Sequence, residues 1–266
     1  MFDSIAGDYD ALNHILSLDV DKIWRKKALK QIVDAPAPAQ VLDLACGTGD
    51  FSIAIAKALS RSHKRVGTPI EAHVKAPAKA PVEAQVTSTG FVTGDSGRSD
   101  LMTKGHVTGV DLSEGMLAVM REKVQKSGLT EMISIEEGDG ENLRFPDNTF
   151  DRVTIAFGIR NFENREKGLR EMLRVLKPGG RLVILELSRP ENKIIRWFYD
   201  LYFLHILPKI GGKVSGDKAA YAYLPASVAA FPGKKAFMAT MREAGFRTVT
   251  HKAFTLGICR MYTGEK

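Results

Sequence analysis

The sequence predicts an α/β fold with a doubly wound, mostly parallel sheet, and two observations support this prediction. Short apolar runs alternate with amphipathic stretches between residues 41 and 187, the pattern of strands joined by crossover helices. The first apolar run ends in a glycine turn, VLDLACGTGD at 41–50, and open α/β sheets bind ligands where their parallel strands end. Two further runs, 246–251 and 257–262, predict antiparallel strands that close the sheet.

We interpret the chain, 1–266, as a single domain with three additions. Residues 1–35 have helical apolar spacing and predict an N-terminal cap. Residues 60–105 are rich in Pro, Ala, Ser and Gly, with little periodicity, and predict a flexible surface insertion. Residues 190–232 predict a helical lid. Part of this lid is apolar almost all round, as in a core helix, a wall for a lipophilic substrate or a membrane-contacting face.

The glycine turn after the first strand contains Gly47, Thr48 and Gly49. Two glycines permit a sharp turn and let a ligand approach the backbone closely. Asp43 interrupts the apolar strand, where a carboxylate is costly to bury unless something pairs with it. The pattern lacks the third glycine of a dinucleotide fingerprint and the Lys-Ser/Thr pair of a phosphate loop. An ordinary strand–turn–helix connection is the alternative. Cys46 has no nearby His in the sequence and is not expected to act as a nucleophile.

Acidic residues follow the second and third predicted strands. Asp111 ends the strand at 106–111, where an acid can accept hydrogen bonds from both ribose hydroxyls of a nucleoside. Asp111 or Ser113 can also cap the helix that begins there. Asp139, followed by Gly140, stands where an acid can accept from an adenine amino group.

The fourth and fifth strands are predicted at 152–157 and 181–187. Residues 166–176, between them, have the apolar spacing of an amphipathic helix. The sequence Lys-Pro-Gly-Gly at 177–180 predicts the end of this helix and a turn.

The composition limits the class of protein. With 44% hydrophobic and 26% charged residues, the chain resembles an ordinary soluble protein. Two cysteines make a disulfide framework improbable and fit a cytoplasmic protein. There is no secretory signal and no run near the roughly 20 apolar residues needed to span a bilayer. The net charge of +7 favours anionic partners without choosing between nucleic acid and a membrane surface.

Several stretches together resemble one family. They are YDALNHILSLDVDKIW near the amino end, the glycine turn, RVLKPGGRLVILELS at 174–188, and the closing YAYLPASVAAFPGKKAF and FTLGICRMYTG. In this order they are similar to the ubiquinone/menaquinone biosynthesis C-methyltransferase family, over almost the whole chain except 60–105. The chain departs from the family at Leu12, usually Met, at Asp21, commonly His, and at Ala156, often Ser.

The resemblance implies a seven-stranded Rossmann-like methyltransferase sheet, S-adenosylmethionine as cofactor and C-methylation of a polyprenylated quinol ring. The C-terminal region is most like that of demethylmenaquinone-type enzymes, with methylation of a 2-polyprenyl-6-methoxy-1,4-benzoquinol in ubiquinone biosynthesis as the alternative. A nucleic-acid methyltransferase is disfavoured, because FGIRN stands at 157–161 in place of an Asn/Asp-Pro-Pro-aromatic motif. A non-catalytic cofactor-binding scaffold is the interpretation from a different class.

The resemblance also suggests roles for residues. Asp43 and the glycine turn would hold the methionine end of the cofactor, and Asp111 the ribose. Arg160 and Asn161, after the fourth strand, would stabilise the phenolate charge that develops as the ring hydroxyl ionises, which makes the adjacent ring carbon more nucleophilic. Tyr9 is the expected hydrogen-bond partner on the substrate side.

His205 is a weaker acid/base candidate than these residues. No metal is expected, because the sequence has no Cys/His ligand cluster. The expected partners are a polyprenylated quinol and the inner face of the membrane, contacted peripherally, without nucleic acid. The oligomeric state stays open between monomer and homodimer.

Overall fold

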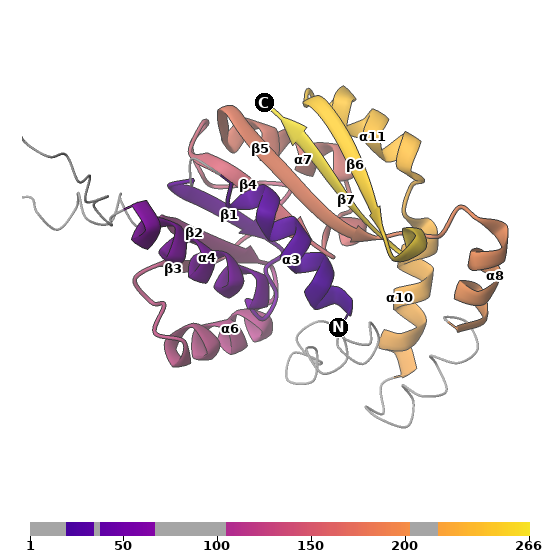
Figure 1. The fold of residues 1–266 in the computed structure, drawn as a ribbon, viewed down its shortest axis with the longest axis horizontal. Helices are drawn as coiled ribbons and strands as arrows, with labels where there is room; N and C mark the ends of the chain where they lie inside the picture. Colours follow the sequence, from indigo (N-terminus) through magenta and orange to yellow (C-terminus); the bar gives the residue numbers. More distant parts are fainter. Residues whose placement is uncertain (1–19, 35–37, 67–104, 203–217) are drawn as a thin grey trace, which may run out of the picture.

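The computed structural model describes residues 20–34, 38–66, 105–202 and 218–266. They contain a seven-stranded sheet in the order β3-β2-β1-β4-β5-β7-β6 (Figure 1). The strands are β1 Gln40–Leu44, β2 His106–Asp111, β3 Ile133–Glu137, β4 Phe150–Ala156, β5 Leu176–Leu187, β6 Arg247–Phe254 and β7 Cys259–Glu265. β1 to β5 pair in parallel, and β7 runs antiparallel to both β5 and β6. The predicted sheet and its antiparallel closing pair are confirmed.

Helices cover both faces of this sheet (Figure 1). α3 Val20–Ile32, α4 Asp50–Val66 and α6 Glu114–Lys126 contribute to one buried cluster, while α7 Arg165–Val175 and α11 Lys234–Glu243 contribute to the other. α8 Lys193–Leu201 and α10 Lys218–Ala230 lie beyond the end to which β5 points, and the short helices η1 Ile159–Asn161 and η3 Thr255–Gly257 complete the described elements. No helix in the described ranges combines the length and apolar character needed to cross a membrane.

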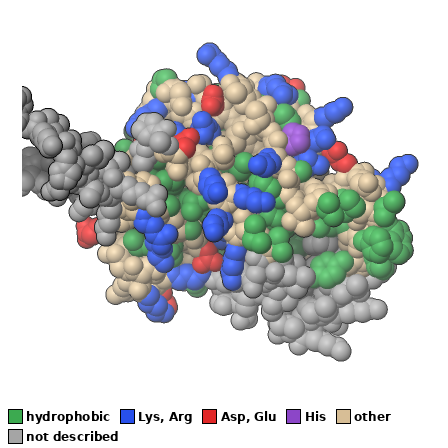
Figure 2. Space-filling model, viewed as in Figure 1, with side chains coloured by type: hydrophobic (Ala, Val, Ile, Leu, Met, Phe, Trp, Pro, Cys, Tyr) green, Lys and Arg blue, Asp and Glu red, His purple; other side chains and the backbone are tan. Residues whose placement is uncertain are grey.

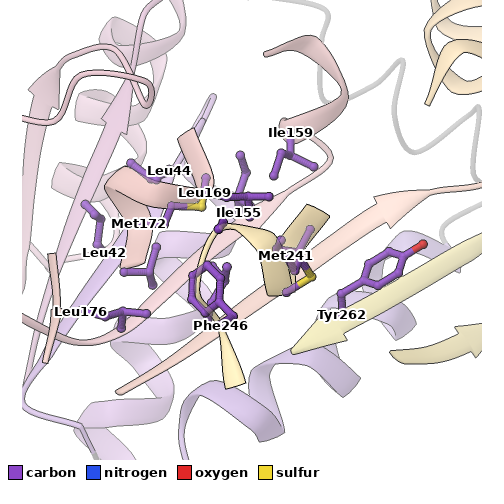
Figure 3. Close-up of a cluster of buried hydrophobic side chains, with 14 of the residues drawn as sticks. Leu42, Leu44, Ile155, Ile159, Leu169, Met172, Leu176, Met241, Phe246 and Tyr262 are labelled. Carbon is purple, nitrogen blue, oxygen red and sulfur yellow. The ribbon is translucent and has the colours of Figure 1, made fainter. Parts of the chain in front are cut away.

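The two clusters arise from the alternation of side chains along each strand. In β1, Val41 packs with α3 and α4, whereas Leu42 and Leu44 join the opposite cluster. In β5, Val183 belongs to the first cluster and Ile184 to the second. Figure 3 shows the second cluster, in which Leu169 and Met172 of α7 and Met241 of α11 lie against the strands. Strands buried on both faces read as nearly continuous apolar runs, as in the sequence.

The structure changes some predicted boundaries. Residues 177–180, predicted as a turn, belong to β5, and the pairing with β4 shifts register between Phe150 and Arg152. Pro178 lacks a backbone donor and Gly179 has φ +75°, so this stretch forms an irregularity within the strand instead of ending it. α4 continues to Val66, through the first residues of the predicted insertion. Tyr9, His205 and residues 67–104 lie outside the described residues.

Candidate active site

The glycine turn stands at the carboxyl end of β1, where residues adopt left-handed backbone conformations. Gly47 has φ +56° and Gly49 φ +84°, which glycine adopts without penalty. Ala45, with φ +49°, and Phe157 at the end of the neighbouring β4, with φ +61°, adopt this region with a Cβ present. Non-glycine residues in this region cost roughly 1–3 kcal/mol and cluster at functional sites. The ends of β1 and β4 therefore form the most constrained backbone around the candidate site.

A pocket opens between these two strand ends. Its described lining comprises Arg25, Asp43, Ala45, Cys46, Gly47, Thr48, Asp50, Phe51, Ala156 and Phe157. Three predicted cofactor residues, Asp43, Gly47 and Thr48, thus line one cavity. Gly49 starts the first turn of α4, whose Ile53 N–H donates to the Gly49 carbonyl at 2.9 Å.

Close packing against Met120 of α6 explains why glycines occur at two positions here. A Cβ on Gly49 would lie 2.4 Å from Met120 Cγ, and one on Gly109 in β2 would lie 2.7 Å from Met120 Cε. The Cys46 thiol lies beside the same side chain, with 3.5 Å between Sγ and Met120 Sδ. Burial raises the pKa of the Cys46 thiol well above its usual range, so Cys46 is not an activated nucleophile.

Asp43 is a buried carboxyl group beneath the pocket. Only 1% of the residue is exposed, and its Oδ2 accepts a hydrogen bond from Ser52 Oγ at 2.6 Å. Burial raises the pKa of Asp43 to about 7, against the lowering effects of the Ser52 hydrogen bond and the Arg25 charge. The Asp43 carboxyl group therefore titrates near neutral pH, in a pocket where a bound cation would favour its ionised form.

Asp111, at the end of β2, connects the glycine turn to the next strand. Its Oδ2 accepts from Gly47 N at 2.8 Å and its Oδ1 from Ser113 N at 2.9 Å. Ser113 is the N-cap of α6, because its side chain accepts from Met116 N, which confirms one of the two predicted caps. Each carboxylate oxygen has more than one acceptor position, so Asp111 can hold the turn and still accept from a ligand.

Asp139 and Gly140 lie in the loop after β3, which approaches Asp111 through a hydrogen bond from Gly138 N to the Asp111 carbonyl at 3.0 Å. Asp139 is exposed, and its Oδ1 accepts from Glu141 N at 2.8 Å. A Cβ on Gly140 would lie 2.6 Å from Phe162 Cζ, so this glycine lets the loop pack against the segment after η1. The predicted ribose and adenine residues are thus neighbours along one edge of the sheet.

Arg160, in η1 after β4, forms a buried ion pair instead of lining the pocket. Its Nη1 lies 3.0 Å from Glu186 Oε1 at the end of β5, and its backbone N–H donates to Glu186 Oε2 at 3.1 Å. Arg160 Nη1 also donates to the Phe157 carbonyl, and its Nε donates to Ser227 Oγ of α10 at 3.3 Å. This guanidinium therefore holds η1 against β5 and α10.

Asn161, the next residue of η1, also contacts α10. Its Oδ1 accepts from the Tyr223 hydroxyl of α10 at 2.9 Å. Two consecutive residues of η1, Arg160 and Asn161, therefore hydrogen-bond to α10, part of the predicted lid. The predicted site residues form two groups, one at the ends of β1, β2 and β3 and one between β4 and the lid.

No sequence pattern predicted a role for Arg25, Glu186, Lys123 or Tyr223, which all belong to this region. Lys123 Nζ donates to Thr48 Oγ1 at 3.1 Å and to Asp50 Oδ1 at 2.7 Å, so α6 fixes the glycine turn. The only usable signal was Glu186, an acid at the end of an apolar strand like Asp43. The contacts of Arg25 and Tyr223 come from distant segments and leave no local pattern.

The chain is similar to known proteins along its whole length. The model of the ubiE/COQ5 methyltransferase family matches residues 1–266. The chain is 39% identical to a demethylmenaquinone methyltransferase of Bacteroides fragilis, covering 100% of this chain and 91% of the relative. It is 43% identical to a ubiquinone/menaquinone biosynthesis C-methyltransferase UbiE of Geobacter sulfurreducens, covering 100% of this chain and 87% of the relative.

Among solved structures, a SAM-dependent methyltransferase from Aquifex aeolicus has a similar fold. The TM-score is 0.53 at 19% identity, over 90% of this chain and 88% of that one. The predicted Rossmann-like methyltransferase fold is therefore confirmed by structural similarity as well as by strand order. On the match of the family model to all 266 residues and on these relatives, the chain belongs to the ubiE/COQ5 methyltransferase family.

Proposed function

We propose that this chain transfers the methyl group of S-adenosylmethionine to a ring carbon of demethylmenaquinol. The observation that carries the proposal is similarity along the whole chain to relatives named demethylmenaquinone methyltransferase, at 39% identity in Bacteroides fragilis and 41% in Deinococcus radiodurans. The relative from Geobacter sulfurreducens carries a name that covers ubiquinone biosynthesis as well. A prenylated methoxybenzoquinol is therefore the second candidate substrate.

The pocket residues fit the cofactor, which supplies an electrophilic methyl group on a sulfonium when bound. Asp43, Gly47 and Thr48 line the pocket that would take its methionine end, and Gly49 completes the turn. The raised pKa of Asp43 reflects a buried acid that a nearby cation would stabilise in its charged form. Asp111 takes the ribose. The loop containing Asp139 and Gly140 takes the adenine, and its link to the Asp111 carbonyl supports the assignment of both to one continuous ligand.

The chain itself must align the quinol and stabilise its developing phenolate. The ring carbon forms a carbon–carbon bond to the methyl group as the sulfur–methyl bond breaks, and S-adenosylhomocysteine would leave as a neutral thioether. The methylated ring carbon then loses its proton to solvent, which restores the aromatic ring. Asn161 accepts from Tyr223 through its amide oxygen, and we assign its N–H donors to a quinol oxygen. Arg160, whose charge is paired with that of Glu186, positions Asn161. Tyr9 keeps its proposed role as a substrate hydrogen-bond partner.

The test offers the protein both quinol classes with methyl-labelled S-adenosylmethionine. We expect reduced demethylmenaquinone to gain one labelled methylene by mass spectrometry, faster than the prenylated methoxybenzoquinol does. Cofactor affinity is measured in parallel by calorimetry. Cofactor binding without product from either quinol would favour the non-catalytic scaffold and refute the proposed reaction.

We also propose that α8 contacts the membrane surface from which a prenylated quinol would enter. Four apolar side chains of α8 are exposed at i, i+3, i+4 and i+7: Ile194 at 70%, Trp197 at 61%, Phe198 at 60% and Leu201 at 39%. Figure 2 shows hydrophobic side chains gathered over this helix. The opposite side of α8, at Tyr199, packs in a small cluster with Val228 of α10. One side of α8 therefore packs on the domain while its other, apolar side is exposed, as in helices that lie in the membrane interface.

Vesicle co-sedimentation tests this contact. Replacing Trp197 and Phe198 by Glu should abolish binding to phosphatidylglycerol-containing vesicles, while activity on a short-chain quinol in detergent is retained. Ile23→Glu, which changes an exposed apolar residue on α3, is the matched control and should bind as wild type does. Equal binding by the α8 variant and wild type would refute the membrane role of α8.

A further inference from the structure

The pocket at the glycine turn is lined by ionisable groups of both signs, Arg25 and the acids Asp43 and Asp50. Asp43 supplies a carboxyl group beneath its floor, and Arg25 of α3 is the only Lys or Arg among its described lining residues. Arg25 also lines the neighbouring groove between α3 and the start of α4. An α-amino acid group carries one positive and one negative charge, so a pocket with this polarity matches a zwitterion.

In the described part of the chain, Arg25 makes two long ion pairs, with Asp21 and Asp50. Its Nε lies 3.5 Å from Asp21 Oδ2, and its Nη1 lies 3.9 Å from Asp50 Oδ2. Both distances exceed the roughly 2.7–2.9 Å of a charge-assisted hydrogen bond. The buried Nε has no hydrogen-bond partner. Asp50 is instead held by Lys123 Nζ at 2.7 Å, so Arg25 is not required to neutralise Asp50.

The Arg25 side chain is nevertheless held in place. Its Cζ lies 5.6 Å from the centroid of the Phe157 ring, within the range of a cation–π contact. The preceding residue, Trp24, is 4% exposed, and its Nε1 donates to Thr255 Oγ1 at 2.9 Å, which fixes α3 against the rest of the domain. Arg25 is partly accessible, with 19% of its side chain exposed. A fixed guanidinium with unused donors in a ligand pocket is arranged to receive an anion.

We propose that Arg25 binds the α-carboxylate of the cofactor's methionine end through the planar fork of its guanidinium. This inference rests on the proposed function, because it takes S-adenosylmethionine as the ligand of the pocket. Arg25 would then fix the methionine end between α3 and the glycine turn. The planar guanidinium matches a carboxylate with two parallel hydrogen bonds, which an ammonium group cannot reproduce.

Two ligands that differ only in this carboxylate provide the test. Calorimetry measures binding of S-adenosylmethionine and of decarboxylated S-adenosylmethionine to wild type, Arg25→Gln, Arg25→Lys and Lys26→Gln. Lys26 is the matched control, because it lies next to Arg25 on α3 and lines only the neighbouring groove. Arg25→Gln should lower the affinity for S-adenosylmethionine roughly 10- to 150-fold, the range of a lost charge-assisted hydrogen bond. The affinity of Arg25→Lys should lie between those of wild type and Arg25→Gln.

The decarboxylated ligand should bind wild type and Arg25→Gln within about twofold of each other, and Lys26→Gln should change neither affinity. An equal loss of affinity for both ligands in Arg25→Gln would mean that Arg25 maintains the shape of the pocket and does not bind the carboxylate, and would overturn the inference. Unchanged S-adenosylmethionine affinity in Arg25→Gln would also overturn it. Failure of wild type to bind S-adenosylmethionine would instead refute the proposed function and this inference with it.

Discussion

The buried pair of Arg160 and Glu186 is expected to stabilise the fold, and a double-mutant cycle can measure how much. The side chains are 6% and 0% exposed. Removing one member of such a pair leaves an uncompensated buried charge, at a cost of about 3–5 kcal/mol. For a domain of this size, that is a fall in Tm of about 6–20 °C. We therefore expect Arg160→Met and Glu186→Leu each to be strongly destabilising.

The two single variants should not be equal. Glu186 accepts from three donors: Arg160 N at 3.1 Å, Arg160 Nη1 at 3.0 Å and Leu187 N at 2.8 Å. Glu186→Leu removes the acceptor of all three donors, whereas Arg160→Met leaves the Glu186 carboxylate with its two backbone donors. Glu186→Leu should therefore be the more destabilising change. The double variant removes both charges and should cost less than the sum of the singles, by about 1–3 kcal/mol.

Urea unfolding followed by circular dichroism gives each free energy of unfolding, with constant m-values as the check on two-state behaviour. Glu186→Gln, which removes the charge and keeps an acceptor oxygen, is the control and should lie between wild type and Glu186→Leu. If the single variants lie within about 1 kcal/mol of wild type and add in the double, the pair does not hold η1. Arg160→Lys separates a direct role from positioning, because a purely positioning Arg160 would lose turnover and stability in parallel.

Three other changes test the pocket. Burial raises the pKa of Asp43 from 3.8 to about 7. Between these two pH values the folded protein keeps a proton on Asp43 that the unfolded chain loses. The contribution of Asp43 to the free energy of unfolding therefore falls by about 4 kcal/mol as the pH rises from about 4 to 7. Asp43→Asn should flatten that slope in pH-dependent urea titrations without cofactor, and an unchanged slope would contradict the assignment. Gly49→Ala, whose Cβ would lie 2.4 Å from Met120 Cγ, should lower Tm more than Gly128→Ala, which also has positive φ but open space; equal losses would exclude the packing explanation. Asp111→Ala should weaken S-adenosylmethionine by about 1–3 kcal/mol in calorimetry and also lower Tm, because Gly47 N loses its acceptor; unchanged affinity would remove Asp111 from the ribose site.

The sequence predicted the features that depend on local pattern. Alternating apolar runs predicted a doubly wound, mostly parallel sheet, and the glycines at 47 and 49 located the turn after its first strand. Ser113, one of two expected caps, is the N-cap of α6. Residues 177–180 were misjudged because Pro and Gly favour turns locally. Pairing of β5 with β4 on either side of them decides their structure instead.

The contacts that the sequence did not predict join residues far apart in the chain. Arg160 was predicted to stabilise the quinol phenolate, and its described contacts with Glu186 and Ser227, which depend on how β5 and α10 pack beside η1, were not predicted. Arg25 belongs to the N-terminal stretch that predicted only a helical cap, although it lines the pocket at the glycine turn. Periodicity reports which side of an element is buried, and it carries no information about which charged groups meet across elements.

The contact of Met120 with Gly49 and Gly109 restricts the order in which this site can change during evolution. A methyl group added at either glycine would overlap the same methionine, so the Met120 side chain would have to move or be replaced by a smaller one first. A smaller residue at 120 alone would leave a cavity in a closely packed region and so lower the stability of the fold. A methyl group added later at the glycine would fill part of that cavity and restore part of the stability. At Gly49 the positive φ of 84° adds a backbone penalty that no change at position 120 relieves. A change at position 109 therefore requires adjustment at Met120 and also at Cys46 Sγ and Ser52 Oγ, which would lie 3.2 and 3.3 Å from the added Cβ, whereas at position 49 the backbone conformation itself favours glycine.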